Sequence, residues 1–264
     1  AGYVTVKRRI FTGQHGANAA VVGVDDDQSR ATYEWLKDQG HANLIPIAVG
    51  QSLDHGVCVI DGVLHDRMAK TDDTVALDDI KTLRGAHNWQ NVAAAYAAAR
   101  CLGLTREQIA AALPGFPGLA HRAESIAVIG GVEYVNDSKA TNAEAAARAL
   151  ATFDDIYWIA GGRAKEGGYA ALDPYLNHVR HAYLIGEAAP DLATALAGKV
   201  DTTRSDTLGS AVAAATQAAQ SAGGHAVILL SPACASFDQF PDYAARGDAF
   251  RALVAGRAPN GGVA

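Results

Sequence analysis

The chain has 264 residues, of which 49% are hydrophobic and 19% charged, and its formal net charge is −6 at pH 7. This composition is typical of a globular protein long enough for two domains, and no run of about 18 apolar residues or signal-peptide pattern predicts a membrane-spanning or secreted protein. The negative charge gives no general attraction to nucleic acid, so an anionic ligand would need a few local cations.

The first 118 residues contain an irregular succession of predicted elements. The patterns predict strands at 19–27 and 44–50, a capped helix at 29–40, a hairpin at 56–66 that turns at Asp61-Gly62, a helix at 88–104, and a second helix at 106–113. Thr105 and Gln108 form a predicted capping box for that last helix.

The segment LPGFPGLAHR at 113–122 is rich in proline and glycine. Such a segment is typical of a connection between domains. We therefore expect one domain at 1–118 and a second at 119–264.

From about residue 120 onward, short β-rich runs alternate with alanine-rich helical runs. The β-rich runs are 126–135, 155–162, 181–186 and 226–231, and the helical runs are 143–153, 171–179, 190–198, 207–222 and 242–256. Such alternation predicts parallel strands with helical crossovers, hence an open α/β sheet. The fully apolar run AVILL is typical of a central strand covered on both faces.

Polar residues crowd into the connection VNDSKATN at 135–142. Thr141 and Glu144 match the S/T-x-x-E pattern, which predicts a helix that starts at Asn142 with Thr141 as its N-cap. Ligands of open α/β sheets bind where strands end and helices begin, and helix amino termini favour anions. A polar turn with a good cap is the simpler interpretation of this segment alone.

Two further polar clusters follow predicted strands. Gly161, Gly162, Arg163 and Lys165 follow one strand, and a second set, Ser231, Ser236 and Asp238, follows another. Each cluster could be an ordinary loop, but together they predict a pocket for a small molecule with more than one carboxylate or phosphate, because charge-assisted hydrogen bonds are strong. Lys139 and Lys165 would be its cations.

Several familiar catalytic motifs are absent from the sequence. It contains no GxGxxG, GxSxG or HExxH, and no GxxxxGK[ST], so this chain cannot by itself form a P-loop phosphate cradle. The cysteines, Cys58, Cys101 and Cys234, have no metal-binding spacing and favour a reducing cytoplasm, with Cys234 a small buried residue beside the pocket.

Five motifs resemble, in order, those of the Mur ligase family, and specifically of its D-glutamate-adding branch. They are GAHNWQN, GLAHRAE, VNDSKATN, GGRAKEGG and LLSPACASFDQFPDYAARGDAF. The last is the most specific, because members that add a diamino acid carry a signature built around Asp-Asn-Pro-Arg. The resemblance begins at about Lys7. The family's uridine-nucleotide domain and P-loop have no counterpart in the sequence, which begins at Ala1 and has Met68 as its only methionine. We therefore expect a second half of such an enzyme, inactive alone.

The resemblance implies a fold and an activity. Residues 1–118 would be the mixed α/β C-terminal part of the central ATP-binding domain, and residues 119–264 a Rossmann-like, mostly parallel C-terminal domain. The reaction would add D-glutamate to UDP-N-acetylmuramoyl-L-alanine through an acyl phosphate, with ATP and Mg²⁺, in peptidoglycan precursor synthesis. A cytoplasmic monomer with small-molecule substrates, and without nucleic-acid or membrane partners, is expected.

The resemblance also implies a role for each matching residue. The residues of the ATP site would be His87, Asn88, Asn91 near the adenine, Arg122 at the phosphates and Asp137 at the ribose. The residues that hold D-glutamate would be Thr141, Lys165, Ser236, Phe237 and Tyr243, the last two through backbone groups. Lys139 would steady the charged intermediate or the substrate carboxylate. Lys7 matches the lysine that the family carbamylates to hold Mg²⁺, although its sequence context alone favours an ordinary solvated helix face.

Three positions depart from the family pattern. Ala120 replaces a proline before the expected phosphate-binding arginine, Phe237 replaces a common leucine, and Tyr243 replaces a phenylalanine. The two aromatic changes preserve backbone contacts, so they predict variation and no loss of function. Two alternatives stay open: another amino-acid ligase, such as a folylpolyglutamate synthase, or a non-catalytic small-molecule-binding module.

Overall fold

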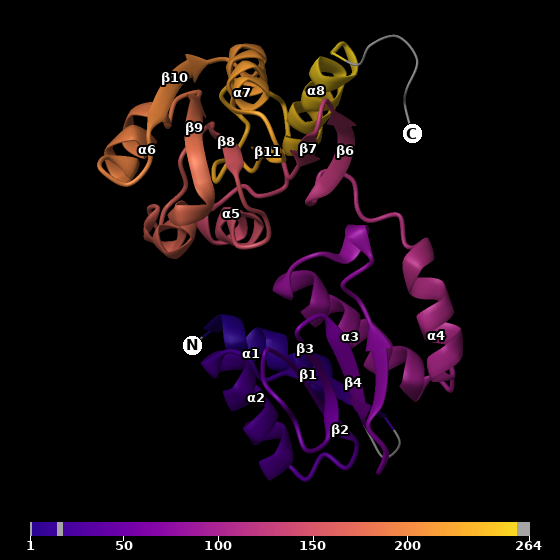
Figure 1. Ribbon diagram of the computed structural model, residues 1–264. Helices are drawn as coiled ribbons and strands as arrows, with labels where there is room; N and C mark the ends of the chain where they lie inside the picture. Colours follow the sequence, from indigo (N-terminus) through magenta and orange to yellow (C-terminus); the bar gives the residue numbers. More distant parts are fainter. Residues whose placement is uncertain (1, 15–17, 258–264) are drawn as a thin grey trace. The chain divides into compact units, whose positions relative to one another are not determined.

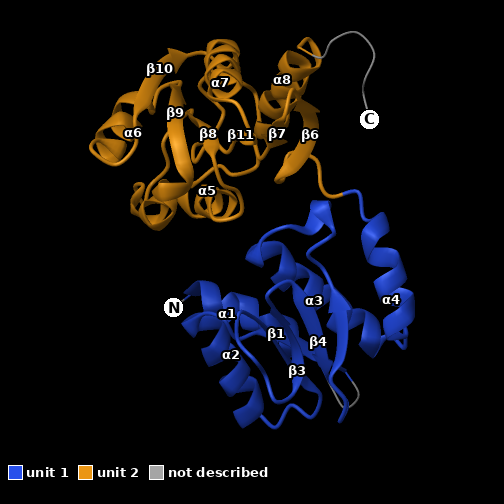
Figure 2. Ribbon diagram, in the orientation of Figure 1, with its two compact units in different colours: residues 1–117 blue, residues 118–264 orange. Residues whose placement is uncertain are grey.

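The computed structural model describes residues 2–14 and 18–257, so Ala1 lies outside the described residues. The chain divides into two compact units, residues 1–117 and 118–264 (Figure 2). No helix in the described ranges is long and apolar enough to cross a bilayer.

Unit 1 contains one five-stranded mixed sheet in the order β1-β2-β3-β4-β5. The strands are β1 (Ala20–Gly23), β2 (Leu44–Val49), β3 (Gly56–Ile60), β4 (Val63–Arg67) and β5 (Asp73–Ala76). The first three are parallel, and β3, β4 and β5 are antiparallel neighbours. The predicted hairpin is confirmed, with Asp61 and Gly62 at φ +48° and +76° between β3 and β4. No predicted element corresponds to β5.

The α-helices in the described part of unit 1 are α1 (Gly2–Arg8), α2 (Asp27–Asp38), α3 (Ala86–Cys101) and α4 (Arg106–Ala112). Side chains alternate along the strands, so Val22 packs on Leu36 of α2 whereas Ile47 packs in the cluster that contains Tyr96 of α3. The predicted capping box is confirmed: the Thr105 hydroxyl accepts a hydrogen bond from the Gln108 amide, and the Gln108 side chain accepts one from the Thr105 amide.

Unit 2 contains a six-stranded sheet in the order β10-β9-β8-β11-β7-β6 (Figure 1). Its strands are β6 (Glu124–Ile129), β7 (Val132–Asn136), β8 (Ile156–Gly161), β9 (Val179–Ile185), β10 (Thr202–Asp206) and β11 (Ala226–Leu230). All pairs are parallel except β6 with β7. The predicted fold class, an open and mostly parallel α/β sheet, is confirmed, and β11 is buried along its length at the centre, as predicted.

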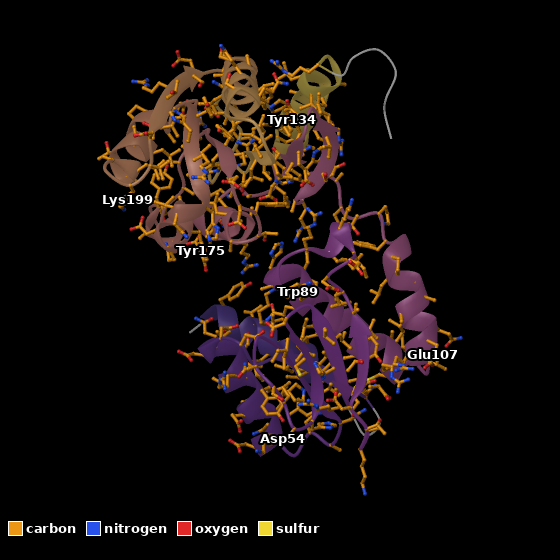
Figure 3. The ribbon with its side chains drawn as sticks, in the orientation of Figure 1. Asp54, Trp89, Glu107, Tyr134, Tyr175 and Lys199 are labelled. Atoms are coloured by element: carbon orange, nitrogen blue, oxygen red, sulfur yellow. The ribbon has the colours of Figure 1, made fainter. Side chains whose placement is uncertain are left out.

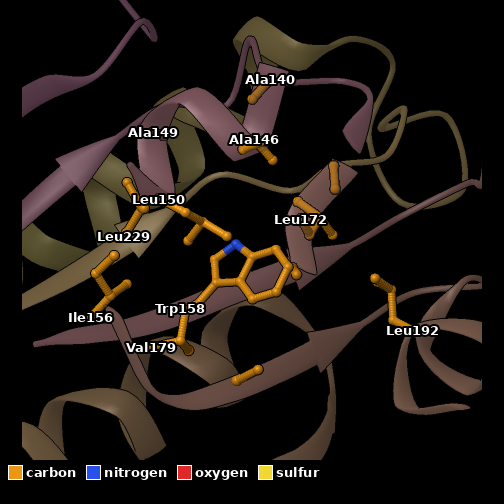
Figure 4. Close-up of a cluster of buried hydrophobic side chains, with 14 of the residues drawn as sticks. Ala140, Ala146, Ala149, Leu150, Ile156, Trp158, Leu172, Val179, Leu192 and Leu229 are labelled. Atoms are coloured by element: carbon orange, nitrogen blue, oxygen red, sulfur yellow. The ribbon is translucent and has the colours of Figure 1, made fainter. Parts of the chain in front are cut away.

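Helices cover both faces of the unit 2 sheet. One face carries α5 (Ala143–Leu150), the 3₁₀-helix η4 (Ala170–His178) and α6 (Ala189–Leu196), and the other carries α7 (Leu208–Ala222) and α8 (Tyr243–Ala255). The first core surrounds Trp158 (Figure 4), whose indole donates a hydrogen bond to the Ser231 carbonyl at 2.8 Å. The second core contains Tyr134 (Figure 3), whose hydroxyl oxygen lies 3.1 Å from Thr216 Oγ1.

The connections around β11 change direction. The chain leaves β7 and β8 for α5 and η4 on one face of the sheet, whereas it leaves β11 for α8 on the other face. Because β11 lies between β7 and β8, neighbouring strands send their chains to opposite faces at the carboxyl edge. Such a topological switch point is the usual position of a ligand crevice in open α/β sheets.

Candidate functional site

Three loops leave the carboxyl ends of β7, β8 and β11, and we name them the β7 loop (137–142), the β8 loop (162–168) and the β11 loop (231–242). The sequence predicted that these strand ends converge, and the strand order confirms that the three strands are neighbours. They carry most of the unit 2 residues with expected roles.

Asp137 joins two of these strand ends. Its Oδ2 accepts a hydrogen bond from the Ser231 hydroxyl at 2.7 Å, and its Oδ1 accepts one from the Ala123 amide at 3.1 Å. Burial raises the pKa of the carboxyl from 3.8 to about 6, although the hydrogen bonds from Ser231 and Ala123 and the charge of Arg122 oppose that rise. The ionised Asp137 carboxylate is therefore destabilised by its burial, and the two hydrogen bonds that it accepts offset only part of this cost.

Asp137→Asn is expected to make unit 2 more stable near pH 7. Because the folded pKa lies above the unfolded value, the stabilisation by protonated Asp137 is complete below pH 3.8 and is lost as the pH rises to about 6. A shift of about two units corresponds to at most ~3 kcal/mol. An asparagine can still accept the Ala123 hydrogen bond, and the Ser231 hydroxyl can turn to accept from its amide. Urea unfolding of both proteins from pH 3 to 8 measures the difference; parallel curves would contradict the assignment.

Arg246 on α8 is a buried residue that the sequence analysis missed. It is 1% exposed, and it donates hydrogen bonds to neutral acceptors of all three strand ends: Ser138 Oγ and O at 3.0 Å each, the Cys234 carbonyl at 3.1 Å and the Gly161 carbonyl at 3.4 Å. Burial lowers its pKa to about 10, so it remains charged at neutral pH. The available signal was its place four residues before Phe250, which puts both side chains on one helix face.

Two glycines let the β8 loop run against the β11 loop. Gly161 and Gly162 have φ values of +128° and +131°, and a Cβ on Gly162 would overlap the Ala235 carbonyl oxygen. Just beyond them, Arg163 and Ala235 exchange backbone hydrogen bonds of 2.8 and 2.9 Å. The beginning of GGRAKEGG is therefore tied to the β11 loop by two backbone hydrogen bonds.

Lys139 and Lys165, the two expected cations, each contact another residue of the predicted site. Lys139 Nζ lies 4.0 Å from the ring centroid of Tyr243, and Lys165 Nζ donates a hydrogen bond to Thr141 Oγ1 at 3.2 Å. Thr141 was predicted to cap α5, and this is wrong. The cap is Asn142, whose Oδ1 accepts from the Ala145 amide at 2.8 Å, because the helix begins one residue later than predicted.

The β11 loop presents Ser236 and Phe237 at its tip. Ser236 is buried, and its carbonyl accepts hydrogen bonds from the Gln239 and Phe240 amides at 3.1 and 2.8 Å. Phe237 is 63% exposed. Cys234 nearby is buried, and burial raises the pKa of its thiol, as suits a structural residue.

The remaining expected residues of unit 2 surround the start of the β7 loop. Arg122 is exposed, next to buried His121, whose Nδ1 lies 3.1 Å from the Asn136 amide nitrogen. The His121 carbonyl accepts from the Lys139 amide at 3.0 Å. The arginine expected at phosphates thus follows a turn that is fixed to the β7 loop.

In unit 1, the expected ATP residues share one helix. His87, Asn88 and Asn91 lie in the first turns of α3, where Asn88 Nδ2 donates to the Arg84 carbonyl at 2.9 Å and Asn91 is exposed. Lys7 is exposed on α1, with its Nζ 5.3 Å from the Tyr3 ring centroid. Within 2–14 and 18–257, no three His, Cys, Asp or Glu side chains are grouped as metal ligands.

The chain is similar in sequence to known ligases, and part of unit 2 matches a family model. Residues 121–234 match the family described as Mur ligase, glutamate ligase domain. The chain is 47% identical to UDP-N-acetylmuramoylalanine–D-glutamate ligase of Phenylobacterium zucineum, over 96% of the chain and 54% of that protein. It is 46% identical to the ligase of that name from Caulobacter vibrioides, over 100% of the chain and 56% of the relative. The chain thus spans about half the length of these curated relatives.

The fold is also similar to that of a solved structure. The structure of UDP-N-acetylmuramoylalanyl-D-glutamyl-2,6-diaminopimelate–D-alanyl-D-alanyl ligase from Acinetobacter baumannii aligns with a TM-score of 0.65 at 18% identity, over 96% of this chain and 55% of that one. The two units therefore have the Mur ligase central and C-terminal domain fold.

Proposed function

We infer that this chain, which is a homologue of the UDP-N-acetylmuramoylalanine–D-glutamate ligases, is the part of such a ligase that binds D-glutamate and contributes to the use of ATP. The observation that carries the proposal is the presence of two lysines and two hydroxyl side chains on three neighbouring strand ends, namely Lys139, Thr141, Lys165 and Ser236. The whole reaction would join the D-glutamate amine to UDP-N-acetylmuramoyl-L-alanine, with release of ADP and phosphate, in the cytoplasm and by a monomer.

The β7, β8 and β11 loops suit an amino acid with two carboxylates. The Lys165 ammonium and the Thr141 hydroxyl are 3.2 Å apart and can both donate to one carboxylate oxygen pair. Ser236, with backbone groups of Phe237 and Tyr243, offers uncharged contacts on the β11 side. D-Glutamate would be held by its carboxylates, which leaves its amine to react.

Each unit contains residues to which we assign a role in ATP use. The exposed Asn91 would contact the adenine, with His87 and Asn88 beside it on α3. The Arg122 guanidinium would face phosphate oxygens. Asp137 would accept a ribose hydroxyl, because an ionised carboxylate has about four acceptor sites and, among the described residues, its oxygens accept two hydrogen bonds.

The chemistry needs charge stabilisation and no nucleophile from the chain. The substrate carboxylate would attack the γ-phosphorus of ATP, forming a C–O–P linkage as the bond to ADP breaks. The D-glutamate amine would then attack that carbonyl and expel phosphate, which leaves the amide. Lys139, held over the Tyr243 ring, would offset the charge of the acyl phosphate and of the leaving phosphate.

Magnesium would lower the charge on the phosphates in such a reaction. A carbamate on Lys7 would supply one anionic ligand, but Lys7 is exposed, and the described residues contain no group of three His, Cys, Asp or Glu side chains that could hold a metal ion. One ligand does not make a magnesium site, so we assign no step of the reaction to a metal held by these residues.

The proposal is tested by titration of the isotopically labelled chain with D-glutamate. We expect shifts of backbone amides in the three loops, with L-glutamate and a diamino acid much weaker, and about tenfold weaker D-glutamate binding in Lys165→Ala and in Ser236→Ala, since each removes a hydrogen bond to a charged group. Lys199→Ala is the control, because Lys199 pairs with Asp173 on the surface. Unchanged binding in both loop variants would overturn the proposed pocket.

A further inference from the structure

The tip of the β11 loop, residues 235–240, is fixed on both sides of Ser236 and Phe237. On the amino side, Ala235 exchanges two backbone hydrogen bonds with Arg163 of the β8 loop. On the carboxyl side, two side chains reach the strand ends next in the sheet. These are Asp238, which contacts the turn after β9, and Gln239, which contacts the end of β10.

The Asp238 contact depends on a glycine. Asp238 Oδ2 accepts a hydrogen bond from the Glu187 amide at 3.1 Å. Gly186 has φ +68°, and a Cβ built on it would overlap Asp238 Oδ2. Only glycine therefore lets the carboxylate approach this turn so closely.

Gln239 forms the second attachment. Its Nε2 donates to the Asp206 carbonyl at 2.6 Å, where Asp206 ends β10 in a left-handed conformation with φ +58°. Asp238 and Gln239 are consecutive, and they attach the tip to the turn after β9 and to the end of β10.

One oxygen of the Asp238 carboxylate lowers the stability of the folded chain. Its Oδ1 is buried and has no hydrogen-bond partner among the residues that the structure describes. A buried acceptor without a partner destabilises a protein. An unpartnered buried oxygen of this kind is expected when a side chain has a functional role, here the positioning of the loop tip.

We propose that Asp238 and Gln239 are positioning residues for amino-acid binding: they fix the backbone of Ser236 and Phe237 in the conformation that receives D-glutamate. This inference rests on the proposed function for its ligand, whereas the attachment of the tip can be measured without any ligand. Neither side chain needs to touch the amino acid. Each acts through the two residues that stand between Ala235 and Asp238.

Hydrogen exchange of the ligand-free chain tests the attachment. We expect amide exchange at residues 236–240 to be about tenfold faster in Asp238→Ala and in Gln239→Ala, since each loses one anchoring hydrogen bond. Asp238→Asn should exchange like the wild type, because its amide oxygen can accept from Glu187. Thr216→Val is the control, since it removes the Tyr134 partner in the core of unit 2. Unchanged exchange at the tip in both alanine variants would overturn the inference.

Binding measurements link the attachment to the ligand. Asp238→Ala should weaken D-glutamate binding about tenfold, with ATP binding unchanged, and Asp238→Asn should restore it. Gly186→Ala should weaken binding similarly, but should add little in an Asp238→Ala background, because both changes break one contact. The inference is wrong if the wild type binds D-glutamate and Asp238→Ala does not weaken that binding. It is also wrong if the losses of binding free energy in Asp238→Ala and Gly186→Ala add fully in the double variant. If wild type does not bind D-glutamate, the proposed function fails, and the exchange result decides the inference alone.

Discussion

Arg246→Ala is expected to lower the free energy of unfolding of unit 2 by about 3–5 kcal/mol, the largest stability effect among the variants considered. The substitution leaves a cavity and removes the donor from three buried carbonyls, those of Ser138, Gly161 and Cys234. Arg246→Lys should lose about half as much, because one ammonium keeps the charge but cannot reach acceptors on three strand ends. Denaturant unfolding followed by Trp158 fluorescence, with Trp35 and Trp89 of unit 1 replaced by phenylalanine, measures both.

Arg251→Ala provides the matched control on the same helix. Arg251 pairs with Glu124 and Asp248 at the surface and is about one-third exposed, so its loss should cost at most ~1 kcal/mol. Equal losses for Arg246 and Arg251 would show that the strand ends do not depend on the buried guanidinium.

Lys139→Ala is expected to lower kcat of the assembled ligase by about 10²–10³-fold, with smaller changes in KM for ATP and D-glutamate. The reason is that a cation placed where charge develops stabilises the transition state more than the bound substrates. The measurement uses a chimera in which this chain follows the amino-terminal part of the Caulobacter vibrioides relative that the 56% match leaves uncovered. Phosphate release gives the rate.

The comparison variants separate the roles of neighbouring residues. Asp137→Ala in the same chimera should chiefly raise KM for ATP, because Asp137 is proposed to hold the ribose. Lys199→Ala should leave both constants unchanged, since its partner is the surface residue Asp173. Negligible effects of both Asp137→Ala and Lys139→Ala would reduce the β7 loop to a polar turn.

The sequence predicted the centre of the unit 2 sheet better than its edges. The run AVILL is apolar at every position, as a strand buried on both faces requires, and it is β11. In contrast, β10 is the edge strand TTRSD, with a mostly polar and partly exposed sequence that no hydrophobic period marks. The predicted run 126–135 hides a hairpin, because Gly130 and Gly131 turn the chain from β6 into β7.

The sequence predicted the position of the site, but it did not predict which side chains contact one another there. Strand ends followed by polar residues located the three loops. The pairing of Lys165 with Thr141 depends on two loops that meet only in the folded sheet. Arg246 finds its Ser138 acceptors 108 positions away, so its role follows from the strand order and not from local pattern. The helix cap was misplaced because Thr141 and Asn142 are both good caps and are adjacent.

The most direct test of the proposed function is ligation by the chimera with different amino acids. With UDP-N-acetylmuramoyl-L-alanine and ATP, we predict phosphate release and a product with the mass of one added glutamate when D-glutamate is present, and neither with L-glutamate or a diamino acid. This chain alone should give no product. A folded chimera that uses L-glutamate or a diamino acid as well as D-glutamate, or that forms no amide with D-glutamate, would contradict the proposal.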